Sequence, residues 1–183
     1  MDDARRTDPP AADPAAAERY LLLADISGYT GFLAGVERDH GIDFSAGVPA
    51  AYPVLAALLD SVIVGVGPAF ALVKLEGDAR AIPSRDHVCT ACPAVADLDL
   101  KFIVHRGPTV RQSVGASTDL LGPAVTVAHR LLKNTIRDEI GYRPYLFLTE
   151  PAASALGLPD LGRAHGETYA DAGTIGGRVL VLG

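Results

Sequence analysis

The sequence has few of the features that would tie it to nucleic acid or to a disulfide scaffold. Its 183 residues include 2 cysteines, and 16 Lys and Arg stand against 22 Asp and Glu, which gives a formal net charge of −6. Non-specific nucleic-acid binding depends on clustered basic side chains, so we expect no nucleic-acid partner for this acidic chain. An acidic pocket can still hold metal ions and, through them, phosphates.

Long uninterrupted apolar stretches are also absent. The first 20 residues contain no apolar core of a secretory signal, and the longest apolar stretch, Ala50–Val73, is interrupted by Asp60, Pro53 and three further Gly or Pro residues. We therefore expect no membrane association and a cytoplasmic location, where the cysteines stay reduced.

What the sequence does contain is enough apolar material for one folded domain. Hydrophobic residues make up 49% of the chain, and its length is typical of a single domain. Residues 1–17 are rich in Pro, Ala and Asp and are predicted to be a disordered tail. Residues 18–183 are predicted to form the domain.

Hydrophobic periodicity predicts an alternation of strands and helices along the domain. The order indicates an α+β fold, in which a mostly antiparallel sheet has its helices packed on one face. The expected strands are Tyr20–Ala24, Phe70–Leu75, Leu98–Val104, Pro108–Val114 (pairing with the one before it), Tyr145–Leu148 and a closing hairpin within Gly166–Leu182; the expected helices are Gly28–Val36, Pro49–Ile63, Ala124–Asn134 and Pro151–Leu156.

Two carboxylates lie at predicted strand ends or turns. Asp25 follows the first apolar strand, and Asp78 lies in a Glu-Gly-Asp turn. Taken singly, Asp25 is explained as the N-cap of the next helix and Asp78 as an ordinary turn residue. Together, on neighbouring strands, they could form a site for Mg²⁺ or Mn²⁺, ions that keep waters and take substrate phosphates as further ligands.

Four segments in this order resemble class III adenylyl and guanylyl cyclases, and in particular a bacterial branch of that superfamily. They correspond to the family's opening strand–turn–helix, its Lys-x-x-Gly-Asp hairpin, its strand ending in His-x-Gly, and the segment with its base-reading and transition-state residues. The segments are Ala24–Phe32, Lys74–Ala79, Leu100–Gly107 and Asp119–Leu131. The resemblance implies a ferredoxin-like, cyclase-type sheet and a nucleoside triphosphate as ligand.

The resemblance also implies residues for the metal and the phosphates. Asp25 and Asp78 would hold two Mg²⁺ or Mn²⁺ ions, assisted by the carbonyl of Ile26. Backbone amides at a helix N-terminus would cradle the phosphates. These amides belong to Ser27, Gly28, Tyr29 and Thr30.

The remaining roles fall on three residues and require a second subunit. Lys74 and Asp119 would read the purine edge from the partner's half of a composite site, and Arg130 would stabilise the pentavalent transition state. The resemblance therefore implies a homodimer. Without it, Arg130 is explained by a surface salt bridge and Lys74 by an exposed strand position.

Two positions depart from the family. Thr126 stands where the family has an Asn one helical turn before Arg130, and its shorter side chain offers no amide to orient the ribose. Asn134 is a further turn away, too far to replace it. The family's phosphate-binding Lys near the C-terminus has no clear match, and the substitutes in this chain are Arg163 and Arg178.

The segment between Ile82 and Asp97 is short for the helix that the family places there. Either this helix is very short, or the sequence omits a segment. The segment contains His87, Cys89 and Cys92, which could supply three zinc ligands. We favour the alternative of a reduced cysteine pair in a loop, because structural zinc usually has four protein ligands.

An interaction module organised by the cysteine segment is the weakest of the functions that remain open at the level of sequence, and two others have more support. One is a homodimeric cyclase that converts ATP or GTP into a 3′,5′-cyclic nucleotide and pyrophosphate. The other is a degenerate cyclase fold that binds a nucleotide or a partner without turnover, and Thr126 and the unmatched Lys favour it. The sequence does not decide between purine and pyrimidine substrates.

Overall fold

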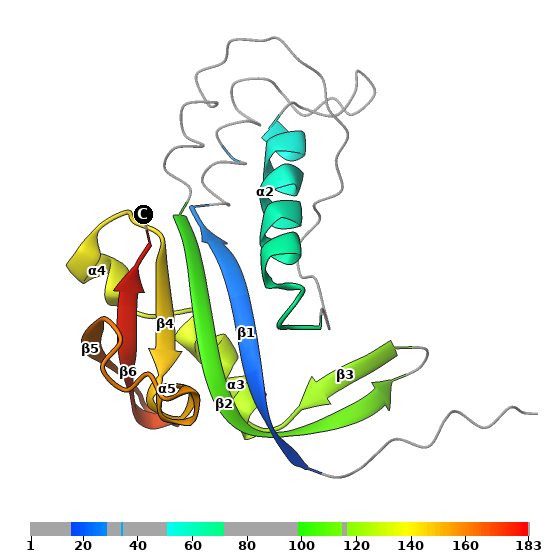
Figure 1. Cartoon of the computed structure of the whole chain (residues 1–183), viewed down its shortest axis with the longest axis vertical. Coiled ribbons are helices and arrows are strands. Elements are labelled where there is room, and N and C mark those ends of the chain that lie inside the picture. Colours follow the sequence, from blue (N-terminus) through cyan, green and yellow to red (C-terminus); the bar gives the residue numbers. More distant parts are fainter. Residues whose placement is uncertain (1–15, 29–33, 35–50, 72–98, 115–116, 183) are drawn as a thin grey trace, which may run out of the picture.

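A twisted six-stranded sheet organises the molecule (Figure 1). The computed structural model describes residues 16–28, 34, 51–71, 99–114 and 117–182. The strand order is β1-β2-β4-β6-β5, and β3 pairs with the far end of β2. The pair of β2 and β4 is parallel and the other four pairs are antiparallel. The predicted α+β class and mostly antiparallel sheet are confirmed.

Strands β1 (Ala17–Ser27) and β2 (Asp99–Val114) form one long antiparallel pair. The prediction of two strands that pair with each other in the region of β2 is wrong. That hairpin would have to reverse within residues 105–107, whereas β1 pairs with this whole stretch, with Arg19 opposite Gly107. β1 is also longer than predicted and begins inside the predicted tail. The end of β2 pairs with β3 (Ser117–Leu121), a strand that we did not predict.

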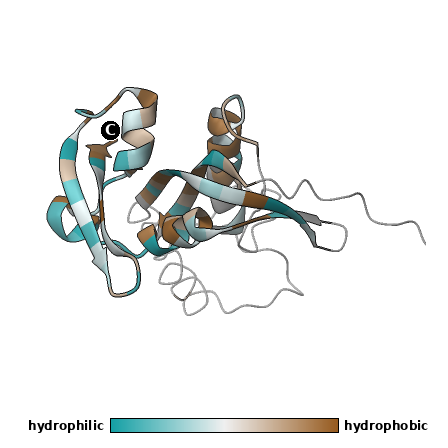
Figure 2. Ribbon diagram, turned by 90° about the horizontal axis from the view of Figure 1, so that it is seen from below, coloured by the Kyte–Doolittle hydropathy of each residue, from teal (hydrophilic) through white to brown (hydrophobic). Residues whose placement is uncertain are grey.

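The C-terminal half of the sheet matches the prediction closely. β4 (Tyr145–Thr149) lies between β2 and β6 (Gly173–Val181), and β5 (Arg163–Tyr169) forms the outer edge. β5 and β6 make the expected closing hairpin. β4 is mostly apolar and buried, as expected for a strand in the middle of a sheet, whereas β5 is mostly hydrophilic (Figure 2).

The helix after β3 is shorter than predicted. Helix α3 (Pro123–Leu131) ends three residues early, and a helix that we did not predict, α4 (Ile136–Ile140), follows it. Asn134 causes the break: its amide donates to the carbonyl of Leu131 at 2.7 Å, and its side-chain oxygen accepts from the Ile136 amide at 3.1 Å. An Asn side chain that bonds nearby backbone in this way competes with the helix and ends it.

Helices cover both faces of the sheet, so the prediction that they share one face is wrong. Leu131 of α3 and Ile136 of α4 pack in one core cluster with Ile103 and Phe147. The other cluster joins the next residues of the same strands, Val104 and Leu148, to Ala152 and Ala153 of α5 (Glu150–Leu156). Successive residues of a strand point to opposite faces, so α5 lies on the face opposite to α3 and α4.

Helix α2 (Ala51–Val66) confirms the second predicted helix, shifted by a few residues. It is apolar over most of its length, which its colour in Figure 2 shows. In the part of the chain that the structure describes, no helix is long and apolar enough to cross a bilayer. Most of the predicted helix Gly28–Val36 and most of the predicted strand Phe70–Leu75 lie outside the described residues.

Candidate functional site

Asp25 lies within β1, two residues before its end, and is therefore not the N-cap of a following helix. Its Oδ2 contacts the Nζ of Lys101 on the neighbouring strand at 2.8 Å. The same Nζ donates to the carbonyl of Leu132, just beyond α3, at 2.8 Å. The side chain of Asp25 is 42% exposed while that of Lys101 is 14% exposed, so the carboxylate still faces solvent beside a largely buried cation.

The residues directly after Asp25 complete β1 and begin a turn at Gly28. Ile26 is half-buried, and Ser27 ends β1. Gly28 has a φ of 85°, which a residue with a side chain rarely adopts, so a glycine fits the turn that the phosphate-cradling hypothesis requires. Tyr29 and Thr30, the other two predicted phosphate-binding positions, lie outside the described residues.

Asp119 lies far from Asp25 along the sheet. On β3 it pairs with Gln112, whereas Asp25 pairs with Lys101, and these two partners are eleven residues apart on β2. At about 3.3 Å per residue this is roughly 36 Å along the strand. The carboxylate accepts a hydrogen bond from the adjacent Leu120 amide at 2.8 Å and is half-buried.

The first turn of α3 begins at Gly122, which has a φ of 129°, with Pro123 at the first helical position. One face of the helix is buried through Ala124, Ala128 and Leu131. Thr126 and Arg130 lie elsewhere on its surface, one turn apart.

The environments of those two residues differ. Thr126 is exposed, and the guanidinium of Arg130 forms an ion pair with Asp171 in the β5–β6 turn. The salt bridge that explains Arg130 without any catalytic role is therefore present. Because Arg130 is still 42% exposed, it remains accessible to a ligand.

Several predicted site residues lie outside the described residues, so their roles stay predictions from the sequence. These are the base-reading Lys74, the second carboxylate Asp78 and the possible zinc ligands His87, Cys89 and Cys92. Within the ranges that the structure describes, no three His, Cys, Asp or Glu residues form a group that could hold a metal ion. Asp25 is thus the one predicted metal-binding side chain whose surroundings can be described.

The two arginines considered as substitutes for a phosphate-binding Lys are both engaged elsewhere. Arg163 forms an ion pair with Glu139 of α4. Arg178 donates to the carbonyls of Leu161 and Gly162, at 3.1 and 2.9 Å, and so holds the loop before β5. Neither arrangement supports a role in phosphate binding.

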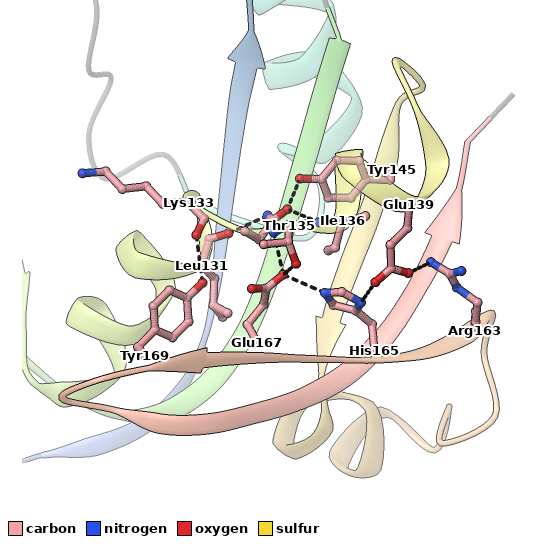
Figure 3. A network of polar contacts seen from close by, with 11 residues as sticks. Leu131, Lys133, Thr135, Ile136, Glu139, Tyr145, Arg163, His165, Glu167 and Tyr169 are labelled. Carbon is pink, nitrogen blue, oxygen red and sulfur yellow. Dashed lines mark hydrogen bonds and ion pairs between the residues drawn. The ribbon is translucent and has the colours of Figure 1, made fainter.

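A polar network that sequence reasoning missed joins β5 to the α3–α4 connection (Figure 3). The side chain of Glu167 accepts from the amide and the hydroxyl of Thr135, at 2.7 and 3.0 Å, and contacts His165 Nε2 at 2.7 Å. The other ring nitrogen of His165 lies 3.2 Å from Glu139 Oε1. A neutral imidazole carries one N–H, so His165 donates to both carboxylates only when it is protonated.

The electrostatics of this network indicate a structural role. Burial alone would raise the pKa of Glu167, but its hydrogen bonds with His165 and Thr135 outweigh burial and lower it. Burial, with the charge of Glu167, raises the pKa of Tyr169 to about 12, so this phenol stays protonated and its hydroxyl donates to the Lys133 carbonyl at 3.2 Å. Each of these groups is satisfied by another part of the fold, which leaves no group directed at a ligand.

His105 is a second buried polar side chain and lies in the middle of β2. Its Nδ1 lies 3.0 Å from the hydroxyl of Thr149, which is fully buried. Burial lowers the pKa of His105 despite the opposing charge of Glu18, so the neutral imidazole is favoured.

Comparison with known proteins finds two partial similarities. Residues 80–140 match a family described as "Protein of unknown function (DUF2652)". A Mycobacterium tuberculosis relative, "Uncharacterized protein Rv2561/Rv2562", is 30% identical over an alignment of 132 residues that covers 56% of this chain. The alignment covers 60% of that relative's length. The family match includes Asp119, Thr126 and Arg130 but not Asp25.

Proposed function

We propose that this chain is a class III-type nucleotidyl cyclase, which converts ATP or GTP into a 3′,5′-cyclic nucleotide and pyrophosphate in a homodimer. The proposal rests on the motif resemblance described above. The structural observation that supports it best is that Asp25, near the end of β1, and Arg130, on α3, are both exposed enough to meet a ligand.

The separation of Asp25 and Asp119 supports a composite site. A stretch of eleven residues along β2 lies between their strand partners, a distance longer than a nucleoside triphosphate. One chain therefore cannot offer its metal-binding carboxylate and its base-reading carboxylate to the same nucleotide. In a dimer related by two-fold symmetry, each nucleotide would take the Asp25 end of one subunit and the Asp119 segment of the other.

The chemistry asked of the side chains is modest, because the substrate supplies its own nucleophile. The ribose 3′-oxygen attacks the α-phosphorus, the bond to the β-phosphate breaks, and pyrophosphate leaves. Two divalent ions, when bound, would activate the hydroxyl and offset charge at phosphorus. The half-exposed carboxylate of Asp25 is a suitable oxygen ligand for such ions, together with Asp78 and the Ile26 carbonyl.

Lys101 and Arg130 would have distinct roles in the proposed active site. Lys101 offsets the charge of Asp25 while the carboxylate has no other cation, and its bond to the Leu132 carbonyl keeps it in place. Arg130 would donate to the equatorial oxygens of the transition state. Thr126 would have to orient the ribose, a task for which its side chain is short.

A second candidate is a degenerate cyclase fold that binds nucleotide without turnover. Two observations favour it: Thr126 in place of an amide, and the ion pair that occupies Arg130. Both candidates predict nucleotide binding, and they differ only in whether product forms.

Product formation with Mn²⁺ and each nucleoside triphosphate, quantified by mass spectrometry, separates the two. If ribose orientation alone limits the enzyme, Thr126→Asn raises turnover with little change in ATP affinity, because the contact matters mainly as the 3′-hydroxyl moves into line. Thr and Asn have similar helix propensities, so α3 should tolerate the change. Arg130→Ala is the inactive control. If wild type and Thr126→Asn form no more cyclic nucleotide than Arg130→Ala does, the degenerate fold is favoured.

A further inference from the structure

The β5–β6 turn brings a carboxylate to the residue that the proposed mechanism needs free. Asp171 is exposed on this turn and pairs with the guanidinium of Arg130. The turn itself is fixed on one side, because Tyr169 donates to the Lys133 carbonyl at 3.2 Å just beyond α3. Glu167, two residues earlier on the same strand, holds Thr135. Asp171 is therefore delivered to Arg130 by an anchored hairpin.

The ion pair is placed so that it can be exchanged. Arg130 and Asp171 are 42% and 54% exposed, and pairs this exposed contribute little net free energy because water competes for both charges. The hairpin does not depend on the pair, since Tyr169, Glu167 and the β5–β6 ladder hold it independently. An anion with more charge than one carboxylate could take Arg130 without disturbing the fold.

We propose that the carboxylate of Asp171 takes the place of a phosphate: it pairs with Arg130 in the free protein, and the polyphosphate chain of the nucleotide displaces it. The identity of the ligand rests on the proposed function, whereas the competition between Asp171 and an anion for Arg130 does not. Asp171 would thus be an autoinhibitory residue of the same site: it lowers affinity for polyphosphate and keeps Arg130 in place until the ligand arrives.

The test uses inorganic tripolyphosphate, which carries the phosphate chain without base or ribose. Calorimetric titration would compare wild type with Asp171→Asn. The matched control is Asp160→Asn, which removes one negative charge from an exposed position in the α5–β5 connection. We expect Asp171→Asn to bind tripolyphosphate about threefold more tightly or better, the factor that corresponds to the free energy of an exposed ion pair. Asp160→Asn should bind as wild type does.

The tighter binding of tripolyphosphate by Asp171→Asn must depend on Arg130. Adding Arg130→Gln to Asp171→Asn should abolish the gain and leave affinity at or below that of wild type. Equal affinities of wild type and Asp171→Asn would overturn the proposal. So would a gain of the same size in Asp160→Asn, or a gain that survives in the double variant, because either result would reflect net charge alone.

The same variants distinguish this inference from the proposed function. An Arg130-dependent gain in tripolyphosphate affinity, without cyclic nucleotide from any variant, would leave the anion competition standing and remove the cyclase. Cyclic nucleotide formation by wild type, with no effect of Asp171→Asn on tripolyphosphate affinity, would support the cyclase and overturn the competition between Asp171 and the anion.

Discussion

The network around Glu167 and the exposed surface of α3 are held in opposite ways. Glu167 is buried and contacts the amide and the hydroxyl of Thr135 and one ring nitrogen of His165. Arg130, a few residues before Thr135, is half-exposed and pairs with one exposed carboxylate, that of Asp171. Groups that stabilise a fold are buried and mutually satisfied, whereas a group that must exchange partners cannot be. This difference separates the residues that we expect to govern stability from those that we expect to govern binding.

The largest expected effect is on the core between the two regions. Phe147 is fully buried on the α3 face of β4, beside Ile103 and Leu131. Phe147→Ala should lower the free energy of unfolding by about 3–5 kcal/mol, through lost burial and the cavity left behind. Urea unfolding would measure it. The control is Leu156→Ala, at a position 48% exposed, for which a change as large as that of Phe147→Ala would contradict the described core.

A smaller loss is expected in the network. Glu167→Gln keeps the shape of the side chain but removes its charge and replaces one acceptor by a donor, which should cost about 1–3 kcal/mol. Glu150→Gln, an exposed carboxylate at the start of α5, should change stability by less than about 0.5 kcal/mol. Thermal unfolding of the two variants side by side measures the difference. Equal unfolding midpoints of the two variants would contradict a structural role of Glu167.

Acid should destabilise the protein in two steps. The pKa of His105 is lowered below 6.5 in the folded state, so the unfolded state takes up the proton first, and stability declines as the pH falls below about 6.5. The pKa of Glu167 is lowered below 4.5, so its stabilisation is lost as the pH falls further, below about 4.5. Urea unfolding at closely spaced pH values should show the first step vanish in His105→Gln and the second in Glu167→Gln. Wild-type stability that stays constant from pH 7 to 4 would contradict both assignments.

The sequence predicted the elements that depend on local signals. The apolar run of β4, the proline near the start of α5 and the glycine-rich closing hairpin each identify their own element. The end of α3 was placed three residues too late, because Asn134 breaks the helix through bonds to Leu131 and Ile136 that helical periodicity does not reveal.

The network itself could not be predicted from the sequence. Thr135 and Glu167 are 32 residues apart, and their contact exists only after β5 has paired with β6 and the α3–α4 connection has packed beside it. The one local signal was the spacing of His165 and Glu167, which places both on one face of a strand. The Asp171 contact with Arg130 is equally non-local, so motif spacing singled out Arg130 without indicating that a carboxylate of the same chain occupies it.

Residues that bind the ligand should be separable from residues that stabilise the fold, and one pair of variants on β1 measures this separation. Asp25 and Glu18 both lie on β1, and each is a partly exposed carboxylate that pairs with a cation on β2, Asp25 with the largely buried Lys101 and Glu18 with the more exposed Arg106. Glu18→Ala should lower the free energy of unfolding by no more than about 1 kcal/mol, and Asp25→Ala by more, because the largely buried Lys101 loses its counter-charge and keeps its bond to the Leu132 carbonyl. Calorimetric titration with ATP and Mn²⁺ should then show metal-dependent binding in wild type and Glu18→Ala and none in Asp25→Ala. Unchanged Mn²⁺-dependent ATP affinity in Asp25→Ala would contradict the account.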